Sequence, residues 1–479
     1  MSFQAAGDHG PRDRARVKFQ QEKPRAAEEK RVFLFLQGPI SPFFPMIAKD
    51  LEARGARTIR VNLCFGDVLF WRRGGSVNYR GTREGWPAFI AELMDREGVS
   101  DLLLLGEQRY YHRMAIEAAQ ARGIVVAVTD FGYLRPDWIT LERDGMSGES
   151  LFPRAPEKIL ALARQVPKFD RSRKFADSFW IMALWDMAYH LSSSLLWMFF
   201  PHYHSHQVHS PIPVYIGTGA RILLRRFRGP RTDRLVKKLR SAGTTYYVFP
   251  LQMETDFQLR AYSPFQDLRV AIRLVVDSFA RNAPADARLI IKVHPLDPGM
   301  VSWRRFSKRA AAECGVSQRV HYVDGGALSP LLAGARGVVT INSTVGIWAL
   351  LAGRPLKVLG QAVYDVDPVT YGDSLDAFWT GAAPPDPLLR DALISAIAGT
   401  IQIRGVFYRR AGLKAAVAEA CERLYRGLLN SPTYHQETKR ASAAAGRSTR
   451  AEDPPREPPG QSPSDEQAEA SAGRPIVSR

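Results

Sequence analysis

The sequence predicts an α/β fold built from two Rossmann-like domains. Short apolar runs rich in Val, Ile and Leu alternate with helix-length segments along most of the chain. Because these runs do not alternate with polar residues, they are typical of strands in a parallel sheet covered on both faces. The 479 residues leave room for about two or three domains, and 45% hydrophobic with 24% charged content is that of a globular protein.

Four apolar runs predict the strands of the first half. They are Val32–Leu36, Thr58–Leu63, Asp101–Leu105 and Val125–Thr129. The helices expected between them include Met46–Arg54 and Ala115–Arg122. Each is followed by a glycine, Gly55 or Gly123, where helices commonly end with left-handed backbone.

Five further runs predict a second parallel sheet. They are Tyr246–Pro250, Leu289–Val293, Val320–Val323, Val338–Ile341 and Leu356–Leu359, with a helix at Val345–Ala352 that Gly353 follows. Two Rossmann-like halves facing a cleft make a GT-B-like architecture. Some epimerases and binding proteins share this arrangement, so the fold by itself does not decide the function.

The composition divides the chain into four parts. We expect a disordered arm at 1–30, an N-terminal Rossmann-like domain at 31–242 that includes a helical, basic segment at 150–242, a second Rossmann-like domain at 243–430, and a disordered tail at 437–479. The tail is rich in Ala, Ser, Gly, Pro and charged residues and cannot bury a core. The polar first 30 residues show no secretory signal.

One stretch, residues 175–200, is long and apolar enough to raise the question of a membrane. Asp177, Asp186 and His190 lie within it and disfavour a span, because charge in the middle of a bilayer is costly. We expect a buried helix here, with a helix on a membrane surface as the alternative.

The charge balance suggests an anionic partner. Lys and Arg number 66 against 48 Asp and Glu, for a net charge of +18. Nucleic acid, an anionic membrane and a phosphorylated substrate would all fit, as would an Arg-rich surface with no partner. No recognised nucleic-acid module accompanies the basic segment, so we expect no nucleic acid.

Cysteine and histidine usage argues against a metal centre. The three cysteines are far apart, which gives neither a disulfide framework nor a paired zinc site and fits a reducing compartment. Four histidines, His202, His204, His206 and His209, could bind zinc, but no Cys or carboxylate accompanies them at a known ligand spacing. We expect no metal, and a basic, aromatic patch facing lipid instead.

In the second half, polar residues follow the predicted strands. His294 and Pro295 come directly after one strand, and Ser343 and Thr344 lie between another strand and a helix. Since parallel strands present their carboxyl ends at one edge, these residues could clamp a phosphate. The alternative is a helix cap and a polar strand end. Two glutamines, Gln252 and Gln361, are expected at the same edge, where Gln252 could hydrogen-bond a nucleobase or sugar or serve only in a turn.

The first half supplies the acids. Glu107 and Asp130 follow neighbouring strands and could act as nucleophile or base, or merely cap helices and pair with arginine. Gln37 ends the first strand. Arg135 and Asp137 lie in a proline-constrained loop, so we expect these three residues at the substrate rim.

At these positions the sequence resembles a known family. The blocks that carry the likeness are FLQGPISPFF (35–44), FGDVLFW (65–71), NYRG (78–81), GYLRPDWITLE (132–142), FPHYHSH (200–206), FPLQMETDFQLRAYSPF (249–265), KVHP (292–295) and NSTVGIWALLAGRPLKVLGQAVYD (342–365). They resemble the capsule polysaccharide biosynthesis/export family, in its KpsS/LipB branch. The likeness runs in order from about residue 31 to 430.

The resemblance implies a β-Kdo transferase on the cytoplasmic face of the inner membrane of Gram-negative bacteria. Such an enzyme moves Kdo from CMP-Kdo to (lyso)phosphatidylglycerol and starts the oligo-Kdo linker of an exported capsule. Its implied partners are the anionic phospholipid acceptor, a second Kdo transferase and an ABC exporter. The alternative is a non-catalytic component of the capsule assembly and export complex that binds the polysaccharide or its lipid end.

The resemblance also implies roles for single residues. His294 with Ser343 and Thr344 would hold the CMP phosphate and stabilise the departing CMP. Asp130 matches the position of an acid-acid-Gly motif in which Phe131 replaces the second acid, so Asp130 is the expected nucleophile and Glu107 the second choice. A β-linkage made from a β-configured donor means that the configuration at the anomeric carbon is retained, which fits two successive displacements through a carboxylate nucleophile. No cofactor is expected, because the leaving group would be the monophosphate CMP and not a pyrophosphate that a metal ion would have to stabilise.

Overall fold

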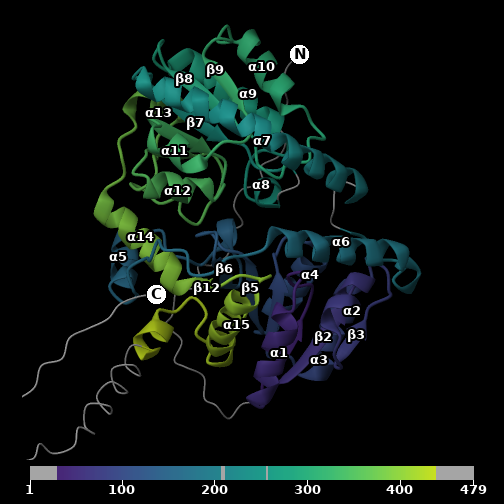
Figure 1. The fold of residues 1–479 in the computed structure, drawn as a ribbon. Coiled ribbons are helices and arrows are strands. Elements are labelled where there is room, and N and C mark those ends of the chain that lie inside the picture. The colour runs from purple at the N-terminus through teal and green to yellow at the C-terminus, as the bar shows by residue number, and fades with distance from the viewer. Residues whose placement is uncertain (1–29, 206–210, 255–256, 439–479) are drawn as a thin grey trace, which may run out of the picture. The chain divides into compact units, whose positions relative to one another are not determined.

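A seven-stranded sheet forms the first half of the protein (Figure 1). The computed structural model describes residues 30–205, 211–254 and 257–438. The strand order is β12-β6-β5-β4-β1-β2-β3. The bounds are β1 Val32–Phe35, β2 Arg57–Asn62, β3 Ser76–Asn78, β4 Asp101–Leu105, β5 Val125–Phe131, β6 Trp138–Arg143 and β12 Gln402–Arg404. Strands β1 to β5 are parallel, whereas β6 and β12 run antiparallel to their neighbours.

Helices connect the parallel strands of this sheet. They are α1 Phe43–Ala53, α2 Phe65–Trp71, α3 Trp86–Glu97 and α4 Tyr110–Gln120. Helix α1 ends as the sequence predicts, since Gly55 adopts φ 90°, a left-handed conformation that a side chain would strain. The four strands predicted for this half all form, while β3 and β6 carry no apolar run that predicts them.

The second sheet has five strands, all parallel, in the order β11-β10-β7-β8-β9. Its strands are β7 Tyr246–Pro250, β8 Arg288–Lys292, β9 Val320–Val323, β10 Gly337–Thr340 and β11 Leu356–Val358. The helices of this half are α8 Phe257–Ala261, α9 Leu268–Asn282, α10 Trp303–Glu313, α11 Leu328–Ala333, α12 Val345–Leu351 and α13 Leu375–Gly381. The predicted α/β class with two Rossmann-like sheets is therefore confirmed.

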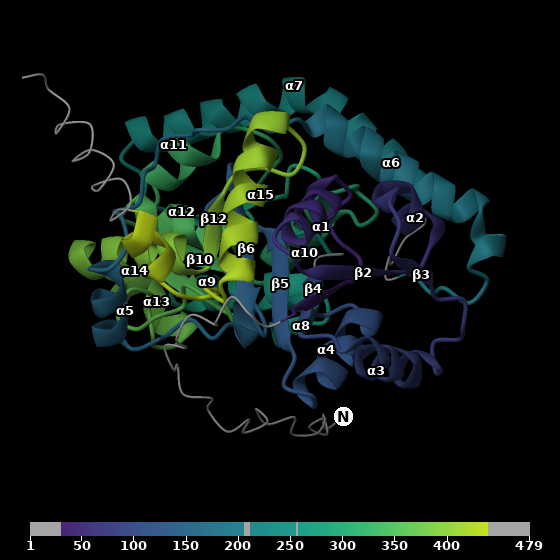
Figure 2. The same cartoon turned by 90° about the horizontal axis from the view of Figure 1, so that it is seen from below.

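The segment between the sheets is helical, as predicted. It contains the short helices η1 Ser147–Glu149 and η2 Trp197–Phe199, and the longer α5 Pro156–Ala163, α6 Phe179–Leu195 and α7 Pro211–Ser241. Figure 2 shows α6 and α7 following one another along one side of the two sheets. Among the described residues, no helix is long and apolar enough to cross a membrane.

Helix α6 is not the buried helix that we expected. Tyr189 is its one fully buried residue, while Trp180 is 74% and Leu184 64% exposed. One side of the helix packs closely on α2. A Cβ at Gly66 of α2 would lie 2.5 Å from the Tyr189 ring, and Ser193 accepts a hydrogen bond from the Gly66 amide at 3.0 Å. The other face of α6 therefore stays uncovered within the described part of the chain.

After the second sheet, the chain returns to the first. Helix α14, Pro387–Thr400, packs on α5; β12 pairs with β6; and α15, Arg410–Tyr425, packs on α1. We expected all of 243–430 to belong to the second domain, whereas β12 joins the first sheet and α15 packs on a helix of the first half. An ion pair between Arg404 of β12 and the buried Asp137 helps to hold the returning strand.

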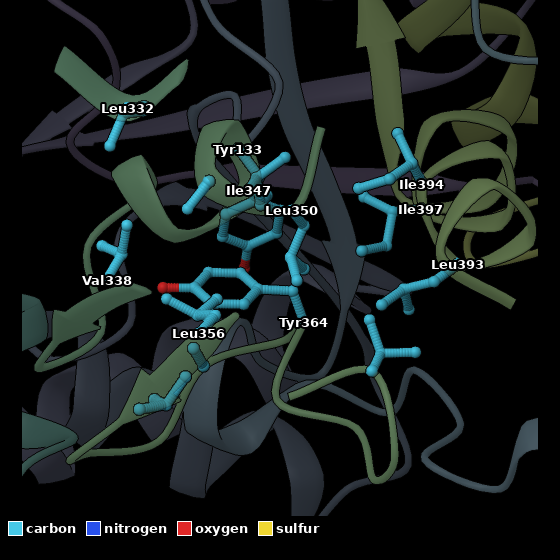
Figure 3. Packing of buried hydrophobic residues seen from close by; sticks show 14 of the residues in the cluster. Tyr133, Leu332, Val338, Ile347, Leu350, Leu356, Tyr364, Leu393, Ile394 and Ile397 are labelled. Atoms are coloured by element: carbon cyan, nitrogen blue, oxygen red, sulfur yellow. The ribbon is translucent and has the colours of Figure 1, made fainter. Parts of the chain in front are cut away.

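A shared hydrophobic core joins the two halves. Tyr133, which follows β5, lies beside Ile347, Leu350 and Tyr364 of the second half (Figure 3). All four residues are buried, with exposures of 6% or less. The loops after the strands of both sheets are therefore fixed against the same apolar cluster, which limits their freedom at the candidate site. The arm, His206, His209 and all but the first two residues of the tail lie outside the described residues.

Candidate active site

A chain of hydrogen bonds connects the carboxyl edge of the second sheet to that of the first. Gln252, after β7, donates to Asn342, after β10, with 2.8 Å between Nε2 and Oδ1. Asn342 Nδ2 donates to the carbonyl of Tyr262 at 3.2 Å. The Tyr262 hydroxyl in turn donates to the carboxyl of Glu107, after β4. Residues that end three separate strands are thus held together.

Glu107 lies where burial favours its neutral form. It is 3% exposed, and burial raises its pKa to about 8, although the hydrogen bond from Tyr262 acts in the opposite direction. Asp130 interacts with it electrostatically and adds to the rise. Gln108 also donates to the Tyr262 hydroxyl, at 2.8 Å. Near pH 7 Glu107 therefore carries a proton that it can donate.

Asp130 occupies a more open position at the end of β5. It is partly exposed, and its Oδ1 accepts a hydrogen bond from the amide of Phe131 at 2.7 Å. Strand β5 lies next to β4, with Leu105 opposite Thr129, which brings Asp130 near Glu107 as the sequence predicts. Two neighbouring carboxyl groups in unlike environments can divide the work, the buried one holding a proton and the exposed one acting as a base or nucleophile.

His294 follows β8 and is partly exposed. Its Nδ1 accepts a hydrogen bond from the amide of Leu296 at 3.1 Å. In the neutral ring this contact leaves the proton on Nε2, which can then donate to an anion. Pro295, next to it, is also partly exposed and contributes no donor. This position suits a phosphate contact.

The loop before α12 is fixed more by packing than by capping. Ser343 accepts a hydrogen bond from the Val345 amide at 3.3 Å, whereas Thr344 occupies the cap position without a side-chain bond. The Tyr364 hydroxyl donates to the Ser343 carbonyl, and its ring packs so close to Gly346 that a Cβ there would lie 2.5 Å from the hydroxyl oxygen. Both predicted residues lie at the expected strand end, in a partly exposed loop.

The two predicted glutamines lie at this edge in different environments. Gln252 is 4% exposed, whereas Gln361 is exposed, and the backbone N–H of Gln361 donates to the Tyr262 carbonyl at 2.7 Å. Gly148 of η1 packs against both Gln361 and Tyr262. A Cβ at this position would collide with the side-chain oxygen of Gln361 and would lie 2.5 Å from the Tyr262 ring. The structure thus places Gln252, Gln361, Asn342 and Tyr262 in one connected group.

The expected substrate rim is not brought together. Asp137 is 2% exposed and accepts hydrogen bonds from Arg404 and from the amides of Lys174 and Phe175, so it holds chain segments in place. The loop in which we expected it continues directly into strand β6. Arg135 is exposed, with its guanidinium 5.2 Å from the Phe131 ring centre.

Gln37 belongs to a buried polar cluster below α6. Its side-chain nitrogen lies 3.1 Å from the Asp67 carboxylate and 2.9 Å from the Tyr189 hydroxyl. Asp67 also pairs with Arg60 at 2.9 Å. Gln37 is 2% exposed, so its contacts support the attachment of α6 to the first domain.

Among the described residues, no group of three His, Cys, Asp or Glu side chains could hold a metal ion. His202 and His204 are exposed there, while the other two histidines of that run are not described. The expectation of metal-independent chemistry stays a prediction.

Sequence reasoning missed Tyr262, the residue that joins the two sheets. Tyr262 is 4% exposed, and burial and the nearby Glu107 hold its pKa well above the ordinary value of 10. It lies within the block FPLQMETDFQLRAYSPF, where only Gln252 attracted attention. A tyrosine in a block this well matched to the family was the available signal.

The raised pKa of Glu107 predicts a pH-dependent stability. Between its ordinary value of 4.5 and about 8, the unfolded chain loses this proton while the folded chain keeps it. The free energy of unfolding therefore falls as pH rises, by up to about 1.4 kcal/mol per pH unit. We expect Glu107→Gln to melt at a Tm at least about 2 °C above the wild type at pH 8, with little difference at pH 5.

Thermal melts at several pH values test this expectation. Glu142 is also buried, with its pKa raised to about 7, so the free energy of unfolding keeps part of its pH dependence in both the wild type and Glu107→Gln. The matched control is Glu117→Gln, an exposed glutamate on α4 that should track the wild type throughout. If Glu107→Gln and the wild type stay parallel from pH 5 to 8, Glu107 is ionised across that range and its proposed acid role fails.

Comparison with known proteins adds evidence of descent. Residues 100–408 match the family model described as capsule polysaccharide biosynthesis protein. The chain is 32% identical to the capsule polysaccharide export protein KpsS of Escherichia coli, over 78% of this chain and 96% of that one. It is 31% identical to the capsule polysaccharide modification protein LipB of Neisseria meningitidis serogroup A, over 80% and 92%.

Among solved structures, the β-Kdo 2,7 transferase KpsC of Thermosulfurimonas dismutans aligns with 82% of this chain and 99% of its own. The identity is 15% and the TM-score 0.40. A TM-score of that size does not establish a common fold, so the description of two Rossmann-like sheets rests on the strand pairing above.

Proposed function

Because the chain belongs to the family of capsule polysaccharide biosynthesis proteins, we propose that it is a glycosyltransferase. The proposed reaction moves Kdo from CMP-Kdo to a (lyso)phosphatidylglycerol acceptor and thereby starts the linker of an exported capsule. The observation that supports it most is the pair of carboxyl groups, Glu107 and Asp130, connected by Tyr262 and Asn342 to the strand ends of the second sheet. An enzyme that transfers between two substrates needs such a meeting of two domains.

In the proposed first step, the Asp130 carboxylate attacks the anomeric carbon of Kdo. The bond from that carbon to the phosphate oxygen breaks, and CMP leaves with the electron pair. His294 donates a hydrogen bond through Nε2 to the departing phosphate, and Ser343 with Thr344 lines the same strand end. Gln252 and Gln361 are proposed to contact the rest of the nucleotide.

In the second step, the oxygen of a lipid headgroup hydroxyl bonds to the anomeric carbon, the bond from that carbon to Asp130 breaks and frees the carboxylate, and the hydroxyl proton passes to water. Two inversions give net retention at the anomeric carbon. The protonated Glu107 is proposed to hydrogen-bond sugar oxygens or the leaving group while Tyr262 fixes its position. We propose that no metal takes part.

The proposed setting is the cytoplasmic face of the inner membrane. The net charge of +18 favours an anionic surface, and the exposed apolar residues of α6 give a means of contact. The proposed partners are the phospholipid acceptor, a second Kdo transferase and the ABC exporter. The printed name of the Escherichia coli relative, an export protein, keeps open the second candidate: a non-catalytic component that binds the polysaccharide or its lipid end.

A transfer assay distinguishes the two candidates. Purified full-length protein receives CMP-Kdo generated in situ, fluorescent phosphatidylglycerol and EDTA, and the products are identified by mass spectrometry. We expect the acceptor to gain a single Kdo even with EDTA present. If folded protein with a verified donor supply yields no product, the non-catalytic candidate or a different donor replaces the proposal; a product that forms only without EDTA overturns metal independence.

A further inference from the structure

A pocket of about 710 Å³ lies between α1, α2 and α6, on the first domain. Three aromatic residues, Phe70, Trp71 and Trp185, and three basic residues, Lys49, Arg72 and Arg73, line it. The volume is within the range of small-molecule sites. Aromatic walls with several cations at one surface site favour a ligand that is part apolar and part anionic.

The cations of this pocket are available to an anion. Arg73 is engaged with Glu52 and with the carbonyl of Pro45. In contrast, neither Lys49 nor Arg72 forms an ion pair with a described residue, and the Arg72 Nε donates to the Leu69 carbonyl at 3.0 Å. The pocket therefore holds more positive charge than its neighbours neutralise, which favours a phosphate group.

The backbone at Arg72 supports a role for its side chain. Arg72 ends α2 with φ 39° and ψ 34°, in the left-handed region where glycine or asparagine is usual. An arginine in this conformation carries strain that glycine would avoid. Strained positions of this kind are concentrated at ligand sites, and this one presents a guanidinium at the pocket.

The wall formed by α6 continues into an apolar surface. Trp185 packs on Phe70 with ring centres 6.0 Å apart, while the opposite side of the same helix exposes a stripe at helical spacing. The stripe consists of Trp180, Leu184, Met187, Leu191 and Leu195, each at least 46% exposed. A soluble sugar phosphate or nucleotide in the pocket would leave this stripe in water, whereas a membrane surface into which α6 is inserted would cover it.

At its inner end the pocket approaches the strand ends of the first sheet. A second, smaller cavity of about 20 Å³ shares Pro45, Phe70 and Trp71 with it and reaches Gly38, directly after Gln37 at the end of β1. Strand β1 lies next to β4, the strand that Glu107 follows. The two cavities share lining residues, and the smaller one lies at the end of β1, the neighbour of the strand that Glu107 follows.

We propose that this pocket binds the phosphate of an anionic phospholipid, with Lys49 and Arg72 on the phosphate, Phe70 and Trp185 along the upper acyl chain, and the glycerol headgroup directed toward the end of β1. The inference rests on the proposed transfer to a phospholipid and adds where that phospholipid binds.

Binding can be measured without any sugar transfer. Full-length protein is titrated calorimetrically with dihexanoyl phosphatidylglycerol, below its micelle concentration, and with dihexanoyl phosphatidylcholine. We expect the double variant Lys49→Gln, Arg72→Gln to bind the phosphatidylglycerol at least tenfold more weakly than the wild type. The matched control, Arg305→Gln with Lys308→Gln on α10, removes the same charge from exposed positions of the other domain and should bind normally.

Vesicles test the stripe separately. Trp180→Gln with Leu184→Gln should lower cosedimentation with phosphatidylglycerol vesicles while leaving the binding of the short-chain lipid intact. If the pocket variant binds the short-chain lipid as the wild type does, the assignment is overturned, even in a protein that transfers Kdo. If both lipids bind equally, recognition of the anionic headgroup fails.

Failure of the proposed function would look different. A wild type that binds the short-chain phosphatidylglycerol through Lys49 and Arg72 yet transfers no sugar supports the lipid site and removes only the transferase. A wild type that self-associates through the stripe, becomes monomeric in the stripe variant and binds neither lipid shows a contact between copies of the chain, and overturns the proposal.

Discussion

Asp130→Asn is expected to lower kcat for sugar transfer by a factor of about 1,000 or more, because the amide cannot serve as a nucleophile toward the anomeric carbon. The fold should persist, since Asn retains an oxygen that can accept the hydrogen bond from the Phe131 amide. Initial rates with saturating donor and acceptor measure the effect, and the melting temperature controls for folding.

The matched control is Asp95→Asn, which removes one carboxylate from an exposed pair with Arg122 and should retain full activity. Intact-mass analysis of wild-type protein with donor alone should reveal one bound Kdo, located by digestion to the peptide containing Asp130. An Asp130→Asn enzyme within tenfold of the wild type would exclude Asp130 as the nucleophile and shift that role to Glu107.

His294→Ala should lower kcat by roughly 100- to 1,000-fold, the usual cost of losing one hydrogen bond to charge that develops in the transition state. Its contact with the Leu296 amide fixes the Nε2 proton for this purpose. The KM for the donor should change far less, because the phosphate becomes more negative as CMP leaves. His294→Gln, which keeps a donor at the end of the side chain, should recover part of the rate.

A change that affects KM alone would assign His294 to ground-state binding only. Unchanged kinetics in a folded His294→Ala enzyme would remove it from the site. His321 is a useful comparison, since it lies in β9 of the same sheet with its pKa lowered by burial and has no proposed role. His321→Gln should leave the transfer rate close to that of the wild type.

The strands with continuous apolar runs were predictable because burial on both faces leaves a local signature. All nine predicted runs form strands. Strands β3, β6 and β12 were not predicted, because none of them has a continuous apolar run; β6 contains the buried polar residues Thr140 and Glu142, whose side chains form hydrogen bonds. A sequence pattern does not record which partner will satisfy a buried polar group.

Part of the candidate site could be predicted from the order of these strands. Topology alone brings Glu107 near Asp130 and His294 near Gln252, because parallel strands end at one edge. Asp137 was misjudged because its partner, Arg404, is 267 residues away. Helix α6 was misjudged because its two faces are both apolar, so periodicity cannot say which one the protein covers.

The return of the chain to the first sheet has a consequence for how the protein is made. On the ribosome, residues 32–143 emerge early, yet the edge of β6 stays unpaired until residues 402–404 have been synthesised. During that interval an open strand edge, and the face of α1 that α15 later covers, are exposed. Nascent chains stalled before residue 402 should therefore be the species most dependent on chaperones.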